Sequence, residues 1–520
     1  MAKSCERGWR KRLAAALLAA AAGLGLVGCY DENCDETATC PSIGGEPSCP
    51  ADPADAPHGE VPARCGVWVS ASLGNDKNDG SPDAPVATLQ RALTLALSGP
   101  RRVFACNELF DAAIEWPTGV DLHGGFHCED LHWRYLHDDT RTTLTAPPDT
   151  TPLTLKGPAD AAPSVLTDLA VTAPDASTPG GSSIAMLALA GARADLRRSE
   201  ILAGNGADGA DGDDHLGAPA KDGQLGKDGV SACTDGVGHG GDMVALDCQD
   251  DASFGGEGGD GGVQAANPGD DGEVAPAGSP QGFGLGGTGE DLFAGLPCTP
   301  GQDGARGDDG QLGLGAAWPP RLTSAGYLGV WGSDGQRGRA GQGGGGGGAS
   351  AGNALCGSAP HGGAGGGSGG SGGCGGKGGR GGQPGGASIA LALLTDGILF
   401  TQVSFQAGNG GRGGAAGMPQ QGGQGGLPGI GGAGLLAAGG PNSACVGGSG
   451  GTGGDGGHAG GGLGGPSIAV AYTGTTFPSL GKSPKVTYGS AGDGGPGSNS
   501  SLDFTTGAPG RAAAIEPLLP

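Results

Sequence analysis

Hydrophobic residues between positions 65 and 205 occur in short runs that Gly, Pro, Asp and Ser separate. Runs this short, bounded by turn formers, predict β-strands. The run 87–97 differs, because Leu89, Leu93 and Ala96 recur at helical spacing and Gly99-Pro100 follows. It therefore predicts one amphipathic helix. Further strands are expected at 67–69, 102–106, 119–126, 143–144, 153–155, 165–171 and 184–189.

A unit of two strands occurs three times along the chain. Its copies begin at Ser183, Ser388 and Ser467, each followed by Ile and Ala, and each copy runs into a glycine-rich tract. Such units are too short to bury a hydrophobic face alone, so they must stack on one another. We expect the three copies to be neighbouring coils of one stack, with the tracts 207–386 and 411–466 as insertions at one edge. A β-sandwich is the alternative use of the same strands.

The order of these elements resembles a known architecture. The Gly74-Asn75-Asp76 loop, the helix and the segment 119–126 are similar to the N-terminal cap and first coils of right-handed parallel β-helix proteins. That superfamily includes pectate lyases and many surface lipoproteins, especially of myxobacteria. The resemblance covers about residues 65–205. It implies an all-β fold, a pair between Cys106 and Cys128 on either side of a Gly-Gly turn, and a role for Trp133 as the aromatic residue after that turn.

Glycine is concentrated in one part of the chain. Residues 201–500 hold 101 of the 121 glycines, so this stretch cannot supply an ordinary apolar core. Residues 369–382 read Gly-Gly-X, and glycine also recurs every third residue from Gly326 to Gly341. Period three indicates an extended threefold helix, similar to the glycine-rich repeats of the mycobacterial PGRS type. We expect a bundle like polyglycine II, with disorder as the alternative.

The N-terminus resembles a bacterial lipoprotein signal. Basic residues precede the apolar run 13–27, which is too short to be a membrane span. Leu26-Val27-Gly28-Cys29 is similar to a lipobox, which implies cleavage before Cys29, lipidation of this residue and an anchor in a membrane. Tyr30, rather than Asp, follows the cysteine, which favours the outer membrane, on its periplasmic or its external face. The alternative is an ordinary signal peptide with a chance cysteine.

These features together predict seven segments. They are a signal peptide at 1–28, an acidic Cys- and Pro-rich stalk at 29–64, a cap with first coils at 65–206, an insertion at 207–386, a coil at 387–410, an insertion at 411–466, and a last coil with the C-terminal tail at 467–520.

Twelve cysteines remain once Cys5 and Cys29 are set aside. An even number in an exported chain predicts disulfides. Zinc is the weaker interpretation, because no CxxC pair occurs. Proximity in the sequence suggests that Cys233 pairs with Cys248 and that Cys356 pairs with Cys374.

Candidate metal sites are weak. Residues 255–260 and 450–455 fit the start of a calcium-binding nonapeptide, but both lack its hydrophobic eighth residue. Loose calcium binding by Asp208, Asp211, Asp213 and Asp214 is the stronger form of this idea. Four histidines lie within residues 123–137, where we expect a solvated turn rather than a metal site.

No catalytic residue, metal or cofactor site is predicted. The formal charge of −25 argues against binding to nucleic acid. The sequence favours a non-catalytic, lipid-anchored protein of the cell envelope with a structural, spacer or adhesive role, and with glycans or extracellular matrix as candidate partners. The alternative is a polysaccharide lyase or hydrolase of the pectate-lyase-like superfamily.

Overall fold

The computed structural model describes residues 48–520, except 235, 277, 353, 357–361, 437, 475 and 482–483. Residues 50–520 form one compact unit, which includes the end of the expected stalk. The expected signal peptide and Cys29 lie outside the described residues. No helix in the described part of the chain has the length and hydropathy of a membrane span.

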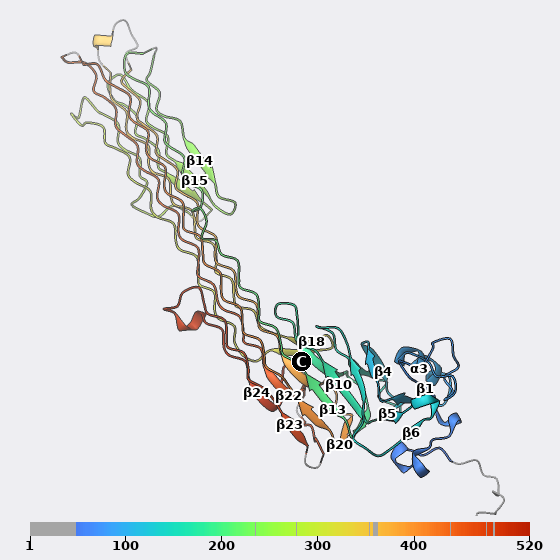
Figure 1. Cartoon of the computed structure of the whole chain (residues 1–520). Coiled ribbons are helices and arrows are strands. Elements are labelled where there is room, and N and C mark those ends of the chain that lie inside the picture. Colours follow the sequence, from blue (N-terminus) through green and yellow to red (C-terminus); the bar gives the residue numbers. More distant parts are fainter. Residues whose placement is uncertain are drawn as a thin grey trace, which may run out of the picture. The chain divides into compact units, whose positions relative to one another are not determined.

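The fold is all-β, with three parallel sheets of six or seven strands (Figure 1). Sheet 1 contains β1 (Val67–Val69), β2 (Arg102–Cys106), β5 (Asp121–His127), β9 (Ser164–Thr167), β12 (Ala194–Arg197) and β20 (Ile398–Thr401), with β6 (Arg134–Tyr135) antiparallel to β5. Sheet 2 contains β3 (Leu109–Asp111), β7 (Thr142–Thr145), β10 (Leu169–Ala173), β13 (Glu200–Ala203), β21 (Ser404–Gln406) and β23 (Lys485–Thr487). Sheet 3 contains β4 (Ile114–Pro117), β8 (Leu153–Lys156), β11 (Ser183–Ala188), β19 (Ser388–Leu393), β22 (Ser467–Tyr472) and β24 (Ala512–Pro517).

The chain visits the three sheets in turn. It passes from β2 in sheet 1 to β3 in sheet 2 and β4 in sheet 3, then returns to sheet 1 at β5, and it repeats this order to β22. Each sheet therefore gains one strand per circuit, beside the strand of the previous circuit. Strands from all three sheets contribute side chains to one shared hydrophobic core, among them Leu122, Leu166, Val171, Met186 and Leu391.

The three copies of the repeat stack as expected. Ser183 of β11 lies opposite Ser388 of β19, which lies opposite Ser467 of β22. All three serines are buried, and each hydroxyl donates to a backbone oxygen of the preceding segment, at 2.8, 2.6 and 2.6 Å respectively. The repeated Ser thus satisfies a carbonyl at the same corner of these three circuits, which explains its recurrence.

One helix covers the N-terminal end of the core. α3 (Leu89–Leu97) begins after Thr88, whose hydroxyl accepts from the backbone N–H of Arg91. The core-facing side chains of α3 are those that helical spacing predicted, with Ala92 in addition.

The prediction of a turn at the Gly-Gly pair is wrong. Gly124 and Gly125 lie inside β5, where the register with β2 shifts between Phe104 and Cys106. Gly125 has φ +74°, which a residue with a side chain rarely adopts. The two glycines therefore form an irregularity within a strand, not a reversal of the chain.

Both long glycine-rich tracts connect sheet 2 to sheet 3. The tract 207–386 follows β13 and precedes β19, and the tract 411–466 follows β21 and precedes β22. They occupy the position that residues 174–182 fill between β10 and β11. The first tract also forms strands that the sequence did not predict, namely β14 (Val244–Asp247), β15 (Ala252–Gly255), β16 (Glu273–Ala275), β17 (Arg321–Thr323) and β18 (Gly326–Leu328).

The remaining short helices are 3-10 turns. They lie at Pro53–Asp55, Pro57–Gly59, Ala63–Cys65, Glu129–Leu131, Ala354–Cys356 and Asp503–Thr505. The first three bring Ala56, Val61 and Cys65 against the outer face of sheet 1, into a cluster with Trp68, Phe104, Phe126 and Trp133.

Candidate functional site

The described residues of the two tracts form extended segments joined by backbone hydrogen bonds, called here the glycine bundle (Figure 1). In residues 369–371, three consecutive backbone N–H groups donate to three different neighbouring segments. The N–H groups of Gly369, Gly370 and Ser371 donate to Gly256 (2.8 Å), Gly448 (3.0 Å) and Gln224 (3.1 Å). A segment with three residues per turn points one N–H group in each of three directions. The three N–H groups of this turn are therefore all hydrogen-bonded to neighbouring segments.

Close packing explains why two of every three residues are glycine. A Cβ added to Gly375 would lie within 3.0 Å of the backbone of Gly338, and one added to Gly376 would meet the backbone of Gln420. The third position of the triplet carries a side chain, as at Cys374 and Lys377. The Gly-Gly-X pattern is therefore a packing requirement of segments that have neighbours on several sides.

Aspartates in the bundle cap backbone groups of a neighbouring segment. The Oδ1 atoms of Asp208, Asp211 and Asp214 accept from the N–H groups of Arg412 (2.6 Å), Ala415 (2.7 Å) and Met418 (2.7 Å). The same contact recurs at Asn205, Asp222, Asp228, Asp303 and Asp309. We call this row the Asp ladder.

The ladder changes the interpretation of the calcium candidates. Asp260 and Asp455, which match the last position of the two nonapeptide-like stretches, accept from the N–H groups of Gly240 and Gly422, each at 2.9 Å. Three of the four aspartates proposed for loose calcium binding belong to the ladder. One oxygen of each of these three carboxylates accepts from an amide in this structure, which gives their period-three spacing a structural cause.

The disulfides confirm one expected pair and correct two. Cys106 bonds to Cys128, as the resemblance implied. Cys233 bonds to Cys356 rather than Cys248. Cys248 bonds to Cys374 rather than Cys356. Cys298 bonds to Cys445, and Cys49 and Cys65 are also oxidised. Proximity in sequence failed because the bundle places distant segments side by side.

His123 is not on a solvated turn. It is fully buried in β5, its ring stacks on Phe104 at 5.5 Å, and Nδ1 lies 3.1 Å from the hydroxyl of Thr167. Nε2 has no hydrogen-bond partner. Burial, and then the positive charge of Arg102, lower the pKa of His123 to about 3. A neutral, enclosed imidazole is a structural group here. His127, by contrast, pairs with Asp138 at 3.0 Å, and His132 and His137 are exposed.

A charged network beside His123 fastens residues 50–56 to the sheets. Arg198 donates to both Asp168 and Asp52 at 2.8 Å, and the hydroxyl of Tyr135 donates to Asp168 at 3.0 Å. Burial disfavours ionisation of Asp52, but the hydrogen bonds from Arg198 and Ala54 outweigh it, so the pKa of Asp52 is lowered. Burial and the charge of Asp168 raise the pKa of Tyr135 to about 12.

A polar cavity of about 320 Å³ adjoins this network. Its lining consists of Ala54, Tyr135, His137, Asp138, Asp139, Thr140, Arg141, Asp168, Arg198 and Gln402. Arg141 is paired with Glu200 and Arg198 is paired with two aspartates, so the cationic groups of the lining are already neutralised.

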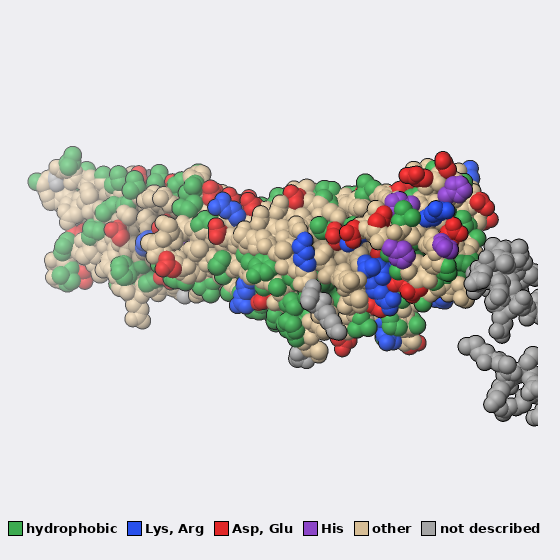
Figure 2. Space-filling model, turned by 60° about the horizontal axis from the view of Figure 1, so that its bottom comes forward, with side chains coloured by type: hydrophobic (Ala, Val, Ile, Leu, Met, Phe, Trp, Pro, Cys, Tyr) green, Lys and Arg blue, Asp and Glu red, His purple; other side chains and the backbone are tan. Residues whose placement is uncertain are grey.

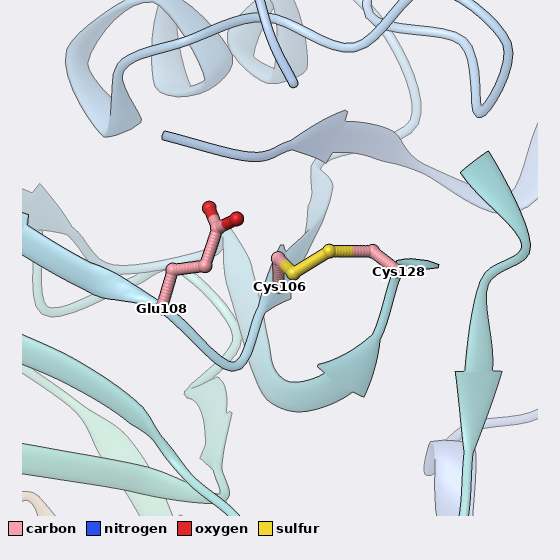
Figure 3. A group of neighbouring side chains, drawn as sticks. All are labelled: Cys106, Glu108 and Cys128. Atoms are coloured by element: carbon pink, nitrogen blue, oxygen red, sulfur yellow. A yellow bond between two sulfur atoms is a disulfide. The ribbon is translucent and has the colours of Figure 1, made fainter. Parts of the chain in front are cut away.

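Cys106, Glu108 and Cys128 are close enough for a shared metal ion (Figure 3). The two sulfurs are bonded to each other, which removes the thiolates that a metal requires. The carboxylate of Glu108 accepts from the hydroxyls of Ser70 and Ser72. The group therefore fits a disulfide beside a capped loop better than a metal centre.

The loops at one end of the glycine bundle carry exposed apolar side chains. We call the loops 231–238, 263–268, 291–298, 351–356 and 433–444 the bundle end, within their described residues. Gly262 forms a backbone β-bridge with Ala351 there, and Ala265 forms one with Asp291. The side-chain amide of Asn442 donates to the carboxylate of Glu290 at 2.6 Å. Figure 2 shows hydrophobic side chains at this end and along the rest of the molecule, whereas the His side chains visible in this view lie over the sheets. The exposed apolar residues of these loops are Val237, Val263, Leu292, Phe293, Leu296, Leu355, Leu435 and Leu436.

Sequence reasoning missed the Asp ladder, the Arg198 network and the bundle end. Asp at period three in a glycine tract was a usable signal for the ladder. No signal in the sequence joined the loops of the bundle end, because they are distant from one another along the chain. Comparison with protein-family models, curated proteins and solved structures finds no match for this chain.

Proposed function

We propose that this chain is a non-catalytic, lipid-anchored protein of the outer membrane, in which a right-handed parallel β-helix carries a polyglycine-II-like bundle. In this proposal the three sheets are the faces of the β-helix, because from β2 to β22 the chain visits them in a fixed order and each circuit adds one strand to each sheet. Right-handed connection is the general rule for parallel strands. The lipobox-like Leu26-Val27-Gly28-Cys29 supplies the anchor.

The observation that carries the proposal is the use of both tracts as one hydrogen-bonded bundle. Segments from 207–386 and 411–466 are hydrogen-bonded to each other within it, as the bonds from Gly370 to Gly448 and from Gly373 to Gly451 illustrate. A bundle of this kind has a glycine interior with little room for a substrate or a cofactor. The bundle instead extends the molecule and presents the loops at its end. This arrangement suits a spacer with an adhesive surface.

Protease treatment of intact cells, with mass mapping of non-reduced peptides, tests this function. We expect loops of the bundle end, such as 291–298, to be cut while the outer membrane is intact. A Cys29→Ala variant is expected to lose its lipid and leave the membrane fraction. Cleavage only after permeabilisation of the outer membrane would contradict presentation at the cell surface.

The competing enzymatic function has its own assay. The purified protein is incubated with polyuronates and calcium, and reducing ends and unsaturated products are measured. The β-helix enzymes that residues 65–205 resemble in sequence would yield such products. We expect none here, and sustained turnover would replace the proposed function by that of a lyase or hydrolase.

A further inference from the structure

The bundle end exposes several large apolar side chains to solvent. The side chain of Phe293 is 79% exposed, that of Leu296 is 60% exposed, and Leu436 is fully exposed. Leu292 is half exposed beside Phe293. These residues come from a chain in which aromatic residues are only 4%. Apolar groups gathered on adjoining loops, instead of in the core, indicate a surface that is buried on contact with a partner.

Covalent and hydrogen-bonded links hold these loops in place. The Cys233–Cys356 disulfide ties two of them, and the Cys298–Cys445 disulfide ties the loop of Phe293 to the adjoining segment. Asp291 accepts from the N–H groups of Phe293 (2.9 Å) and Ala294 (3.1 Å), which fixes the turn that displays the phenyl ring. The apolar side chains are therefore presented by braced loops.

The composition around the bundle end narrows the class of partner. No Lys or Arg occurs in residues 228–305, 340–376 or 413–481. Attraction to phosphate or to an anionic lipid headgroup requires such cations. Trp and Tyr, which with Arg dominate protein-binding hot spots, are also absent from 228–305, 340–376 and 413–466. The polar side chain of Glu290 is buried and already bonded to Asn442 and to Ala351.

We propose that the bundle end inserts Leu292, Phe293 and Leu436 into the interface of a zwitterionic lipid bilayer other than the one that holds the anchor. Leu and Phe are the side chains that enter the boundary between headgroups and acyl chains, and such insertion needs no cation. This inference rests on the proposed function, because the anchor and the bundle end must face different membranes. In this proposal the partner of the bundle end is a lipid surface.

Vesicle bridging tests the proposal with the full lipidated protein. The protein is anchored in phosphatidylcholine vesicles, and capture of bare fluorescent phosphatidylcholine vesicles is measured by flotation. We expect the wild type to capture bare vesicles, with little dependence on salt. The variant Phe293→Ser/Leu436→Ser should lose about a hundredfold in capture, because two buried apolar side chains are removed from the contact. The matched control is Leu399→Ser/Phe504→Ser, which removes one exposed Leu and one exposed Phe elsewhere, and it should capture vesicles as the wild type does.

Each other outcome overturns the proposal. Equal capture by Phe293→Ser/Leu436→Ser and by the control would exclude insertion by these residues. Capture only of vesicles that contain phosphatidylglycerol would indicate an electrostatic contact. Capture only when both vesicles carry the protein would make a second copy of this chain the partner. No capture by the wild type would exclude a lipid partner, while cleavage of the bundle end on intact cells would still support the proposed function.

Discussion

At the scale of single residues, His123 makes stability depend on pH. Its pKa is about 3 in the folded chain and about 6.5 when unfolded, so between these values only the unfolded chain binds the proton. The free energy of unfolding should therefore fall by about 1.4 kcal/mol for each pH unit below about 6.5, until about pH 3. Asp52, Arg102, Arg197 and Arg198 are the charged groups that face the ring. A His123→Gln variant should lose this dependence, as measured by urea unfolding at pH 7 and pH 4.5.

The matched control for this prediction is His132→Gln. His132 is exposed, so its replacement removes an imidazole without disturbing the buried core. The lowered pKa of Asp52 adds a loss of stability only below its ordinary value of 3.8, outside the two pH values compared. An unchanged slope in His123→Gln would mean that His123 takes up a proton in the folded chain.

At the scale of elements, glycine identity should matter by position within the bundle. Gly375→Ala places a methyl group against the backbone of Gly338, whereas Gly217→Ala meets no atom within 4 Å. Overpacking of this kind costs about 1–3 kcal/mol, and a glycine replaced in open space costs nothing or stabilises slightly. Urea unfolding should therefore show a lower midpoint for Gly375→Ala and an unchanged or higher one for Gly217→Ala. Equal midpoints would contradict a closely packed bundle.

The Asp ladder makes a second prediction at this scale. Replacing Asp208, Asp211 and Asp214 together by Ala removes the acceptors for three amides, while the corresponding Asn variants keep an oxygen in place. Hydrogen exchange at Arg412, Ala415 and Met418 should accelerate about fivefold in the Ala variant, since each lost bond is worth about 1 kcal/mol. Asp213→Ala should leave these three amides unaffected. If the Ala and Asn variants exchange alike, the carboxylates do not brace the segment.

At the scale of the whole molecule, the sequence predicted the stacking but not the neighbours within the bundle. The repeated Ser-Ile-Ala placed β11, β19 and β22 side by side, because strands with the same sequence bury the same face. The Gly-Gly-X period gave the conformation of a segment, yet every segment offers similar donors and could pair with any other. The partners of Cys233 and Cys374 were therefore wrong, and the loops of the bundle end could not be assembled. His123 was misplaced because a Gly-Gly pair inside a strand looks like a turn.

The division between sheets and bundle leads to a prediction for a shortened chain. Among the described residues, none in the core shared by the three sheets comes from 207–386 or 411–466. Replacing both tracts by copies of 174–182, which already join sheet 2 to sheet 3, should leave the sheets folded and the Cys106–Cys128 disulfide formed. Circular dichroism and non-reducing peptide mapping check this.

The shortened chain should also reverse the effect of one set of substitutions. Leu322, which lies in the removed tract, packs in one cluster with Ile184, Ile389 and Ile468 on the other face of sheet 3. In the full chain, replacing these three isoleucines by Thr should destabilise the protein, because buried apolar contacts are lost. In the shortened chain the same side chains are largely uncovered, so the replacement should reduce aggregation, measured by sedimentation, at little cost in stability. A shortened chain that fails to fold even with the three Thr residues would mean that the bundle holds the sheets together, rather than growing out of them.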